Sequence, residues 1–283
     1  MNCFFVSDLH GRTDKYQKLF DVIALEEPGA VFIGGDFLPF GPSMQIYTSH
    51  SFIHDYMIPE MEKLRLNMTD GFPPIFMIMG NDDERAEESG IREMEHLGLL
   101  EYIHDRMVSF GKFQIYGYAY VPPTPFYLKD WERYDISRYI DPGDISLEEG
   151  RYSIPVDERE QKHSTIKADL DRLAGGDSMN QAVFLFHAPP YQTLLDRGNL
   201  DGMKVDGVPL DIHVGSIAIR NFIEKRQPLL TLHGHIHESA RLSGSWKDQI
   251  GRTHMFSAAH DGNHLALISF DLDDPGNATR RLI

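Results

Sequence analysis

The chain has 283 residues, of which 41% are hydrophobic and 25% are charged, proportions that are ordinary for a soluble globular protein. Its 43 acidic and 27 basic residues give a formal net charge of −16, which argues against non-specific binding to nucleic acid or anionic membranes. The only cysteine is Cys3, so no internal disulfide can form. We expect a cytoplasmic protein without a membrane span or a signal peptide.

Five short apolar runs are predicted to be buried β-strands, at residues 3–6, 30–33, 75–79, 182–186 and 228–232. Amphipathic stretches between them predict helices. One starts with Thr13 as its N-cap, one carries Phe52 and Met57 and is kinked or broken by Pro59, and one is capped by Ser216. Further helices are predicted around residues 91–97 and 157–173. Strands and helices in alternation are typical of a parallel sheet covered on both faces.

Three segments depart from this alternation. Residues 108–110 and 113–120 predict a hairpin around Gly111, and residues 253–258 and 264–272 predict another around the turn at 261–263. The acidic, aromatic-rich stretch of about 121–180 breaks the pattern without a linker. We therefore expect a single domain over 1–283 with an insertion at 121–180, whose acidic run at 141–149 is a solvated loop.

Side chains that can bind metal follow each of the five apolar runs. They are Asp8, His10, Asp36, Asn81, His187, His235 and His237. The carboxyl ends of strands in an open α/β sheet meet at one edge, so these groups are expected to converge. His235 and His237 are two residues apart, and an extended backbone would point both in one direction. The sequence therefore predicts a metal site.

The chemistry of these ligands narrows the choice of metal. A mixture of imidazole, carboxylate and amide oxygen suits Mn, Fe, Zn or Ni better than calcium, and the absence of thiolates excludes a structural zinc cage. Seven ligands exceed what one tetrahedral ion takes. Two divalent ions that share a bridging carboxylate are therefore predicted, an arrangement used to attack phosphorus with a bridging hydroxide.

The motifs resemble those of the calcineurin-like metallophosphoesterase superfamily. Its signature of Asp-x-His, Gly-Asp, Gly-Asn-His-Asp/Glu, a strand-end His and Gly-His-x-His is matched in order, by residues 8–10, 35–36, 80–83, 187 and 234–237. Residues 211–216 and 234–239 are similar to a bacterial and archaeal branch of predicted phosphoesterases.

The resemblance implies a four-layer α/β/β/α sandwich with mixed sheets. It also implies how the ligands divide between two ions. One ion would take Asp8, His10, Asp36 and His237, and the other would take Asp36 as a bridge with Asn81, His187 and His235. The implied activity is hydrolysis of phosphoester bonds in a small molecule or nucleotide.

Position 82 departs from the family pattern, because Asp82 stands where the family has a histidine that can protonate the leaving group. A carboxyl group with an ordinary pKa near 4 is a poor general acid at neutral pH. We therefore expect a phosphodiesterase, with Asn81 and Asp82 as catalytic residues. The alternatives are a phosphomonoesterase, a metal hydrolase of amides or aminated bases, and a non-catalytic interaction module that keeps the fold, as one retromer subunit does.

Several other residues carry two interpretations. Arg85 and His213 are predicted to contact the substrate, although an exposed arginine at a helix start and a solvated histidine would look the same. His233 could join a three-histidine site, but packing at the strand end is favoured. His254 and His260 are either substrate contacts or solvated. Four aromatic residues could stack on a nucleobase or, as we favour, anchor the insertion: Tyr120, Phe126, Tyr127 and Trp131.

Overall fold

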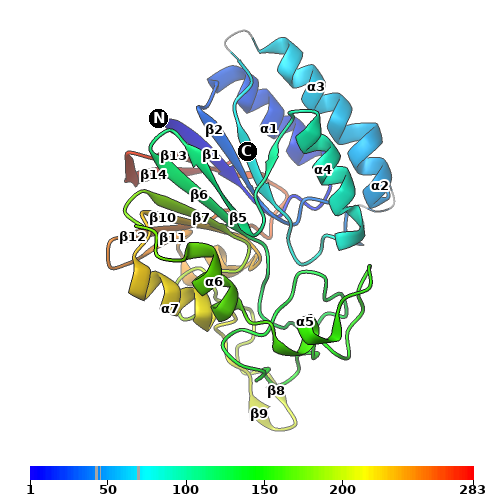
Figure 1. Ribbon diagram of the computed structural model, residues 1–283, viewed down its shortest axis with the longest axis vertical. Helices are drawn as coiled ribbons and strands as arrows, with labels where there is room; N and C mark the ends of the chain where they lie inside the picture. The colour runs from blue at the N-terminus through cyan, green and yellow to red at the C-terminus, as the bar shows by residue number, and fades with distance from the viewer. Residues whose placement is uncertain (42–43, 45, 69–70) are drawn as a thin grey trace.

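The computed structural model describes residues 1–41, 44, 46–68 and 71–283. Two six-stranded mixed sheets pack against each other, and helices cover the outer face of each sheet (Figure 1). This arrangement confirms the predicted α/β/β/α sandwich. Among the helices of the described residues, none has the length and apolar composition that crossing a bilayer requires.

The first sheet has the strand order β14-β13-β1-β2-β3-β4. The strands β1 to β4 run parallel, whereas β13 is antiparallel to β1 and β14 is antiparallel to β13. Their bounds are Asn2–Val6 (β1), Ala30–Gly34 (β2), Ile75–Ile78 (β3), Glu101–Tyr102 (β4), Ala266–Asp271 (β13) and Asp274–Leu282 (β14).

The second sheet has the order β11-β12-β10-β7-β6-β5, with a parallel centre and an antiparallel strand at each edge. Its strands are Arg106–Phe110 (β5), Phe113–Tyr118 (β6), Ala182–Phe186 (β7), Leu230–His233 (β10), Lys247–Ile250 (β11) and Thr253–Ser257 (β12). A separate small hairpin is formed by Lys204–Val205 (β8) and Val208–Pro209 (β9).

The helices beside the first sheet are α1 (Thr13–Glu26), α2 (Ser49–Ser51), the π-helical η2 (Phe52–Met57), α3 (Ile58–Asn67), the 3-10 turn η3 (Arg85–Glu87) and α4 (Glu88–His96). Beside the second sheet lie α6 (Ile166–Ala174) and α7 (Ile217–Arg226) (Figure 1). The remaining helices are α5 (Glu158–His163) and α8 (Ser239–Ser243). The Ser216 hydroxyl caps α7 as expected, because it accepts a hydrogen bond from the Ile219 amide.

Several local predictions need correction. The N-cap of α1 is Arg12, and Thr13 is the first helical residue. Pro59 does not break its helix, because the backbone stays right-handed helical through Met57 and Ile58 from η2 into α3. The π-helical turn of η2, a local change of hydrogen-bond register, lies directly before the proline. The single helix predicted at 157–173 is two helices, α5 and α6, interrupted at Ser164 and Thr165.

The hairpin predicted at the C-terminal end is wrong, whereas the hairpin around Gly111 is confirmed as β5 and β6. The two strands of the rejected hairpin, β12 and β13, belong to different sheets. The turn at residues 261–263 therefore links the sheets. β13 and β12 instead pair with β14 and β11, two polar edge strands that the hydrophobic pattern does not reveal.

The segment from Tyr120 to Trp131 contains part of the predicted aromatic core. Tyr120 and Trp131 are buried, whereas Phe126 and Tyr127 are exposed. The favoured packing interpretation therefore holds for two of the four rings. The acidic run at 141–149 is a loop whose residues are exposed or half-buried apart from Leu147.

Candidate metal centre

The predicted ligands follow parallel strands of both sheets. Asp8 follows β1, Asp36 follows β2 and Asn81 follows β3 in the first sheet, while His187 follows β7 and His235 follows β10 in the second. Because the two sheets pack face to face, their carboxyl ends meet. One ligand atom from each of Asp8, His10, Asp36 and His237 can be chosen such that all four lie within 4.8 Å of one another.

The backbone at these residues is strained. Asp8, His10, Asp36 and His235 have φ angles of 59°, 47°, 49° and 72°, in the left-handed region that side chains other than glycine rarely adopt. Such strain persists where the surrounding structure enforces it, commonly at functional sites. It also corrects the prediction for the histidine pair. β10 ends at His233, so a turn rather than strand alternation positions His235 and His237.

Two glycines make room for the carboxylates. A Cβ atom at Gly234 would overlap Asp8 Oδ2, and a Cβ at Gly80 would overlap Asp36 Oδ1. Both glycines belong to the family motifs noted in the sequence. Their role is therefore close approach of the backbone to the candidate ligands.

The ligand atoms of the first group lie within a few ångströms of one another. His10 Nε2 lies 3.1 Å from His237 Nε2, and His237 Nε2 lies 3.3 Å from Asp8 Oδ1. Asp36 Oδ2 lies 3.7 Å from His10 Nε2. In the described part of the chain, the buried Asp8 Oδ2 has no hydrogen-bond partner. These atoms suit a divalent cation, which accepts lone pairs from carboxylate and imidazole alike.

The second group centres on His187, which is completely buried. Its Nδ1 lies 2.8 Å from the carbonyl of Gly34 and must donate to it, because a carbonyl only accepts. In the neutral ring Nε2 then carries a lone pair. That atom lies 3.0 Å from Asn81 Oδ1 and 3.3 Å from Asp36 Oδ2, and the His187 and His235 rings are 5.2 Å apart. The hydrogen bond to Gly34 orients His187 as outer partners orient metal-binding histidines.

The four charged groups that face one another have strongly shifted pKa values. Burial alone would raise the pKa of Asp8, but His237 outweighs it and lowers that pKa to about 2. Burial likewise would raise the pKa of Asp36, and His187 holds it well below its usual range. Burial would lower the pKa of both histidines, but these carboxylates outweigh it and raise the pKa of His187 to about 10 and that of His237 to about 9.

The other two histidines differ. Burial lowers the pKa of His10, and burial with the neighbouring His187 lowers the pKa of His235 to about 3. Neutral imidazoles are the form that binds metal, so these two rings are ready ligands. The protonated pair, His187 and His237, would release protons when a metal binds.

Asp82 lies at the edge of the first group. Its backbone amide donates to Asp36 Oδ1 at 2.9 Å, and its side chain accepts a hydrogen bond from Asn81 at 3.1 Å. Asp82 Oδ2 is 3.7 Å from His10 Nδ1. Burial, then the charges of Asp36 and Asp83, raise the pKa of Asp82 to about 8.

Asp83 is a residue to which the sequence assigned no role. It is fully buried, and its carboxylate accepts hydrogen bonds from the backbone amides of Phe37, Leu38 and Gly80. It thereby ties the loop that carries Asp36 to the loop that carries Asn81. The sequence feature that could have pointed to Asp83 is the Asp/Glu at the last position of the family's Gly-Asn-His-Asp/Glu motif.

His233 packs inside the sheet, as the favoured interpretation predicted. Its Nδ1 donates to the Ala188 carbonyl at 2.9 Å, and its Nε2 lies 2.7 Å from the Thr231 hydroxyl. Both ring nitrogens are therefore satisfied within the protein.

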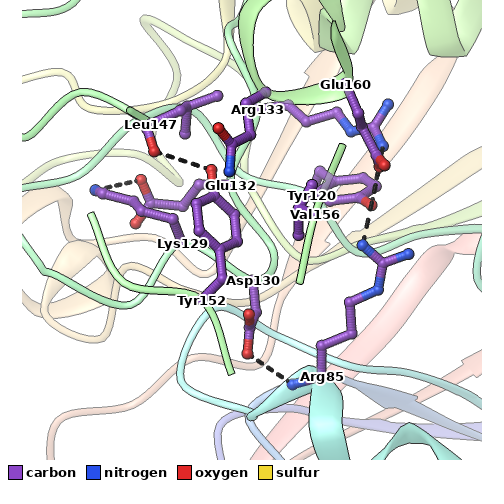
Figure 2. Close-up of a pocket in the computed structure, with 11 residues that line it drawn as sticks. Arg85, Tyr120, Lys129, Asp130, Glu132, Arg133, Leu147, Tyr152, Val156 and Glu160 are labelled. Atoms are coloured by element: carbon purple, nitrogen blue, oxygen red, sulfur yellow. Dashed lines mark hydrogen bonds and ion pairs between the residues drawn. The ribbon is translucent and has the colours of Figure 1, made fainter. Parts of the chain in front are cut away.

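The two predicted substrate contacts, His213 and Arg85, each contact other side chains of the protein. His213 contacts Asp196 at 2.9 Å and the ring of Tyr191. Arg85 begins η3 and faces the insertion, where its guanidinium lies 5.6 Å from the Trp131 ring centre. Figure 2 shows Arg85 in a small pocket formed by insertion residues. His254 lies within β12, and His260 lies beside the turn at 261–263. The substrate role of Arg85 and His213 stays a prediction.

Fold and site together define an α/β sandwich with histidine and carboxylate side chains gathered at the strand ends. A sequence model of the calcineurin-like phosphoesterases matches residues 1–239, and the chain belongs to this family. The family uses divalent metals and acts on phosphoesters, and the Asp/His cluster described above could bind such ions.

Solved structures share the fold. The protein TT1561 of Thermus thermophilus has 14% sequence identity and a TM-score of 0.55, with 99% of this chain and 98% of that chain covered. A second crystal structure has 15% identity, the same coverage of both chains and a TM-score of 0.60. No curated protein matches the sequence. At such low identity, the structural likeness supports the fold alone.

Proposed function

We propose that this protein is a phosphoesterase that works with two divalent metal ions and prefers phosphodiesters. The observation that carries the proposal is the group formed by Asp8, His10, Asp36 and His237, whose ligand atoms lie within 4.8 Å of one another. Asp8 Oδ2 accepts no hydrogen bond from the described residues, and His10 Nε2 lies 3.1 Å from His237 Nε2; both observations support metal binding over a purely structural ion pair.

The division of ligands follows the two groups in the structure. Asp8, His10, Asp36 and His237 would hold one ion, while Asp36, Asn81, His187 and His235 would hold the second. When bound, divalent ions such as Mn, Fe, Zn or Ni supply a Lewis acid and lower the pKa of water. Asp36 lies between the groups, with Oδ2 within 3.7 Å of His10 and 3.3 Å of His187.

The protein's own residues would fix the geometry and the charge of the site. The hydrogen bond to the Gly34 carbonyl fixes which nitrogen of the neutral His187 ring carries the proton. The hydrogen bonds to Asp83 connect the loop that carries Asp36 with the loop that carries Asn81. Asn81 would orient the reacting phosphate. Groups held in place before the reaction need no reorganisation during it.

The preference for diesters rests on Asp82. Without metal, burial and then the charges of Asp36 and Asp83 raise the pKa of Asp82 to about 8. Two bound divalent cations would oppose this rise and favour the carboxylate, which opposes a doubly charged monoester more than a singly charged diester. An imidazole at this position could protonate a poor leaving group, which a carboxyl group with a pKa near its ordinary value does poorly. Position 82 would therefore select diesters and esters with good leaving groups.

The test is hydrolysis of bis(nitrophenyl) phosphate against nitrophenyl phosphate, each with Mn, Fe, Ni and Zn. We expect a higher kcat/KM for the diester with at least one metal. A higher value for the monoester would replace the diester preference with a phosphomonoesterase. Tightly bound metal without turnover of either ester would indicate a non-catalytic module.

Three further predictions belong to this proposal. The substrate is a small phosphoester or nucleotide, with Arg85 and His213 as its contacts. The chain is a single domain in which residues 121–180 are an insertion. Its single cysteine suits the cytoplasm.

A further inference from the structure

A cavity of about 470 Å³ lies between α4, the ends of β4 and β6, and the insertion. This volume falls within the range of small-molecule sites. Four guanidinium groups line the cavity, those of Arg85, Arg92, Arg106 and Arg133. The whole chain carries a net charge of −16, so this gathering of arginines is a local exception.

Several buried hydrogen-bond donors of the cavity are poorly matched within the described part of the chain. Although the Glu88 carboxylate lies near enough to act on it, the hydroxyl of Tyr102, a residue that is 1% exposed, has no hydrogen-bond partner of normal geometry there. The same holds for the buried Nε atoms of Arg85 and Arg106. The carboxylates nearest to the Arg85 guanidinium, on Glu88 and Glu160, are 3.8 Å away. Buried polar groups are nearly always hydrogen-bonded, so these donors point to a ligand that accepts.

His104 adds a buried imidazole to the lining of the cavity. Its Nδ1 accepts a hydrogen bond from the Ala119 amide at 3.1 Å, so in the neutral ring Nε2 carries the proton and is a donor. Burial, then the charges of nearby arginines led by Arg133, lowers the pKa of His104 well below its usual value. The surroundings of His104 therefore disfavour an additional positive charge.

Four carboxylates also line the cavity, on Glu88, Asp105, Glu160 and Asp169. Four positive and four negative groups give the lining a formal charge of zero. Glu160 is the informative one, because its carboxylate lies between two guanidiniums, 2.5 Å from Arg133 and 3.8 Å from Arg85 (Figure 2). Its side chain is 35% exposed and belongs to the short helix α5. It occupies the position that an external anionic group would take.

The cavity lies beside the candidate metal centre, at the same edge of the sheets. β4 pairs in parallel with β3, whose end carries Asn81, and β6 pairs in parallel with β7, whose end carries His187. The residues after β4 and β6 that line the cavity, His104 and Tyr120, are therefore one strand further out at the same edge. None of the predicted metal ligands lines it.

We propose that this cavity binds a compact anion of the phosphate class, which displaces the Glu160 carboxylate and accepts hydrogen bonds from Arg85 and Tyr102. Guanidinium groups bind phosphate oxygens in pairs with favourable geometry. The site needs no metal, so anion binding can be tested apart from the proposed metal-dependent hydrolysis, although both proposals use Arg85.

The test is calorimetric titration of pyrophosphate into full-length protein from which metal has been removed by EDTA and dialysis. We expect saturable binding of one anion per chain. Arg85→Gln should weaken binding at least about tenfold, because a charge-assisted hydrogen bond is lost. Tyr102→Phe should weaken it about threefold. Glu160→Gln should tighten it about tenfold, because the competing carboxylate is neutralised.

Arg281→Gln is the matched control, since Arg281 is a partly exposed arginine paired with Glu26 on α1. Its dissociation constant should equal that of the wild type. The proposal is overturned if the wild type does not bind pyrophosphate, or if Glu160→Gln and Tyr102→Phe both leave the dissociation constant unchanged. Those two conservative variants decide the question even if Arg85→Gln does not fold.

Discussion

Two buried charged clusters in this molecule differ in a way that separates function from structure. In the insertion, Lys129 and Glu132 form a fully buried ion pair at 2.6 Å. The Lys129 amine also donates to the Thr124 carbonyl, and both Glu132 oxygens accept from Thr124. Every charged atom of this pair is therefore matched by protein.

The cluster at the strand ends is the opposite. Asp8 Oδ2 is buried without a hydrogen bond from any described residue, and two imidazole nitrogens face each other at 3.1 Å. Three of the four residues in the group, Asp8, His10 and Asp36, have positive φ angles, whereas neither Lys129 nor Glu132 does. Burial of charge alone does not mark a functional site. A buried carboxylate oxygen that accepts no hydrogen bond from the described residues, on a strained backbone, does.

The largest expected effect is on turnover. Asp36→Asn should reduce kcat/KM at least about 1,000-fold, because Asp36 is shared by both groups of ligands and its charge would stabilise both metal ions. Metal content and diester hydrolysis measure the effect. A variant that retains both metal ions and wild-type turnover would refute the bridging role of Asp36.

The second effect is on stability and concerns the other cluster. Glu132→Ala should lower the free energy of unfolding by about 3–5 kcal/mol, because it leaves the Lys129 charge buried and unpaired. Urea denaturation measures it. The metal content of the folded variant should equal that of the wild type. Loss of metal in the folded Glu132→Ala protein would erase the distinction between the clusters.

The third prediction concerns pH. Without metal, the pKa values of His187 and His237 in the folded protein, about 10 and about 9, exceed the ordinary value of 6.5. Their contribution to stability is then fully present below pH 6.5 and is lost as the pH rises through 9 and 10. Metal affinity should rise over the same window, because binding requires deprotonated imidazoles.

Denaturation of the EDTA-treated protein at stepped pH measures this dependence, with His237→Gln as the control. The variant should lose less stability than the wild type between about pH 7 and about pH 10. Equal losses in both proteins would show that His237 does not carry a raised pKa in the folded state.

The smallest expected effect is at position 82. Asp82→His should raise turnover roughly tenfold on esters with poor leaving groups, because an imidazole can donate a proton near neutral pH. A series of phenyl esters with graded leaving groups measures it. If the substitution changes turnover for no leaving group, position 82 has no role in proton transfer.

The sequence could predict the buried strands and the family motifs, because continuous apolar runs and fixed spacings are local signals. It could not assign β12 and β13 to different sheets, since a turn signal does not tell which strands pair across it. It missed β11 and β14, whose polar edge positions carry little hydrophobic pattern.

The site was predictable in composition and less so in geometry. The predicted residues do gather, yet His235 reaches its place through a left-handed turn that strand alternation does not foresee. The structural role of Asp83 depends on amides from two loops, Phe37 with Leu38 and Gly80, that are distant in sequence. Such contacts become visible only when the fold has brought the loops together.

The most direct test of the proposed two-metal centre is metal analysis of the purified wild-type protein, paired with diester hydrolysis before and after treatment with EDTA. We expect about two divalent ions per chain, loss of turnover when they are removed, and recovery when Mn, Fe, Ni or Zn is restored. Turnover that survives complete removal of metal, or a chain that binds no divalent ion, would contradict the assignment of the cluster at the strand ends.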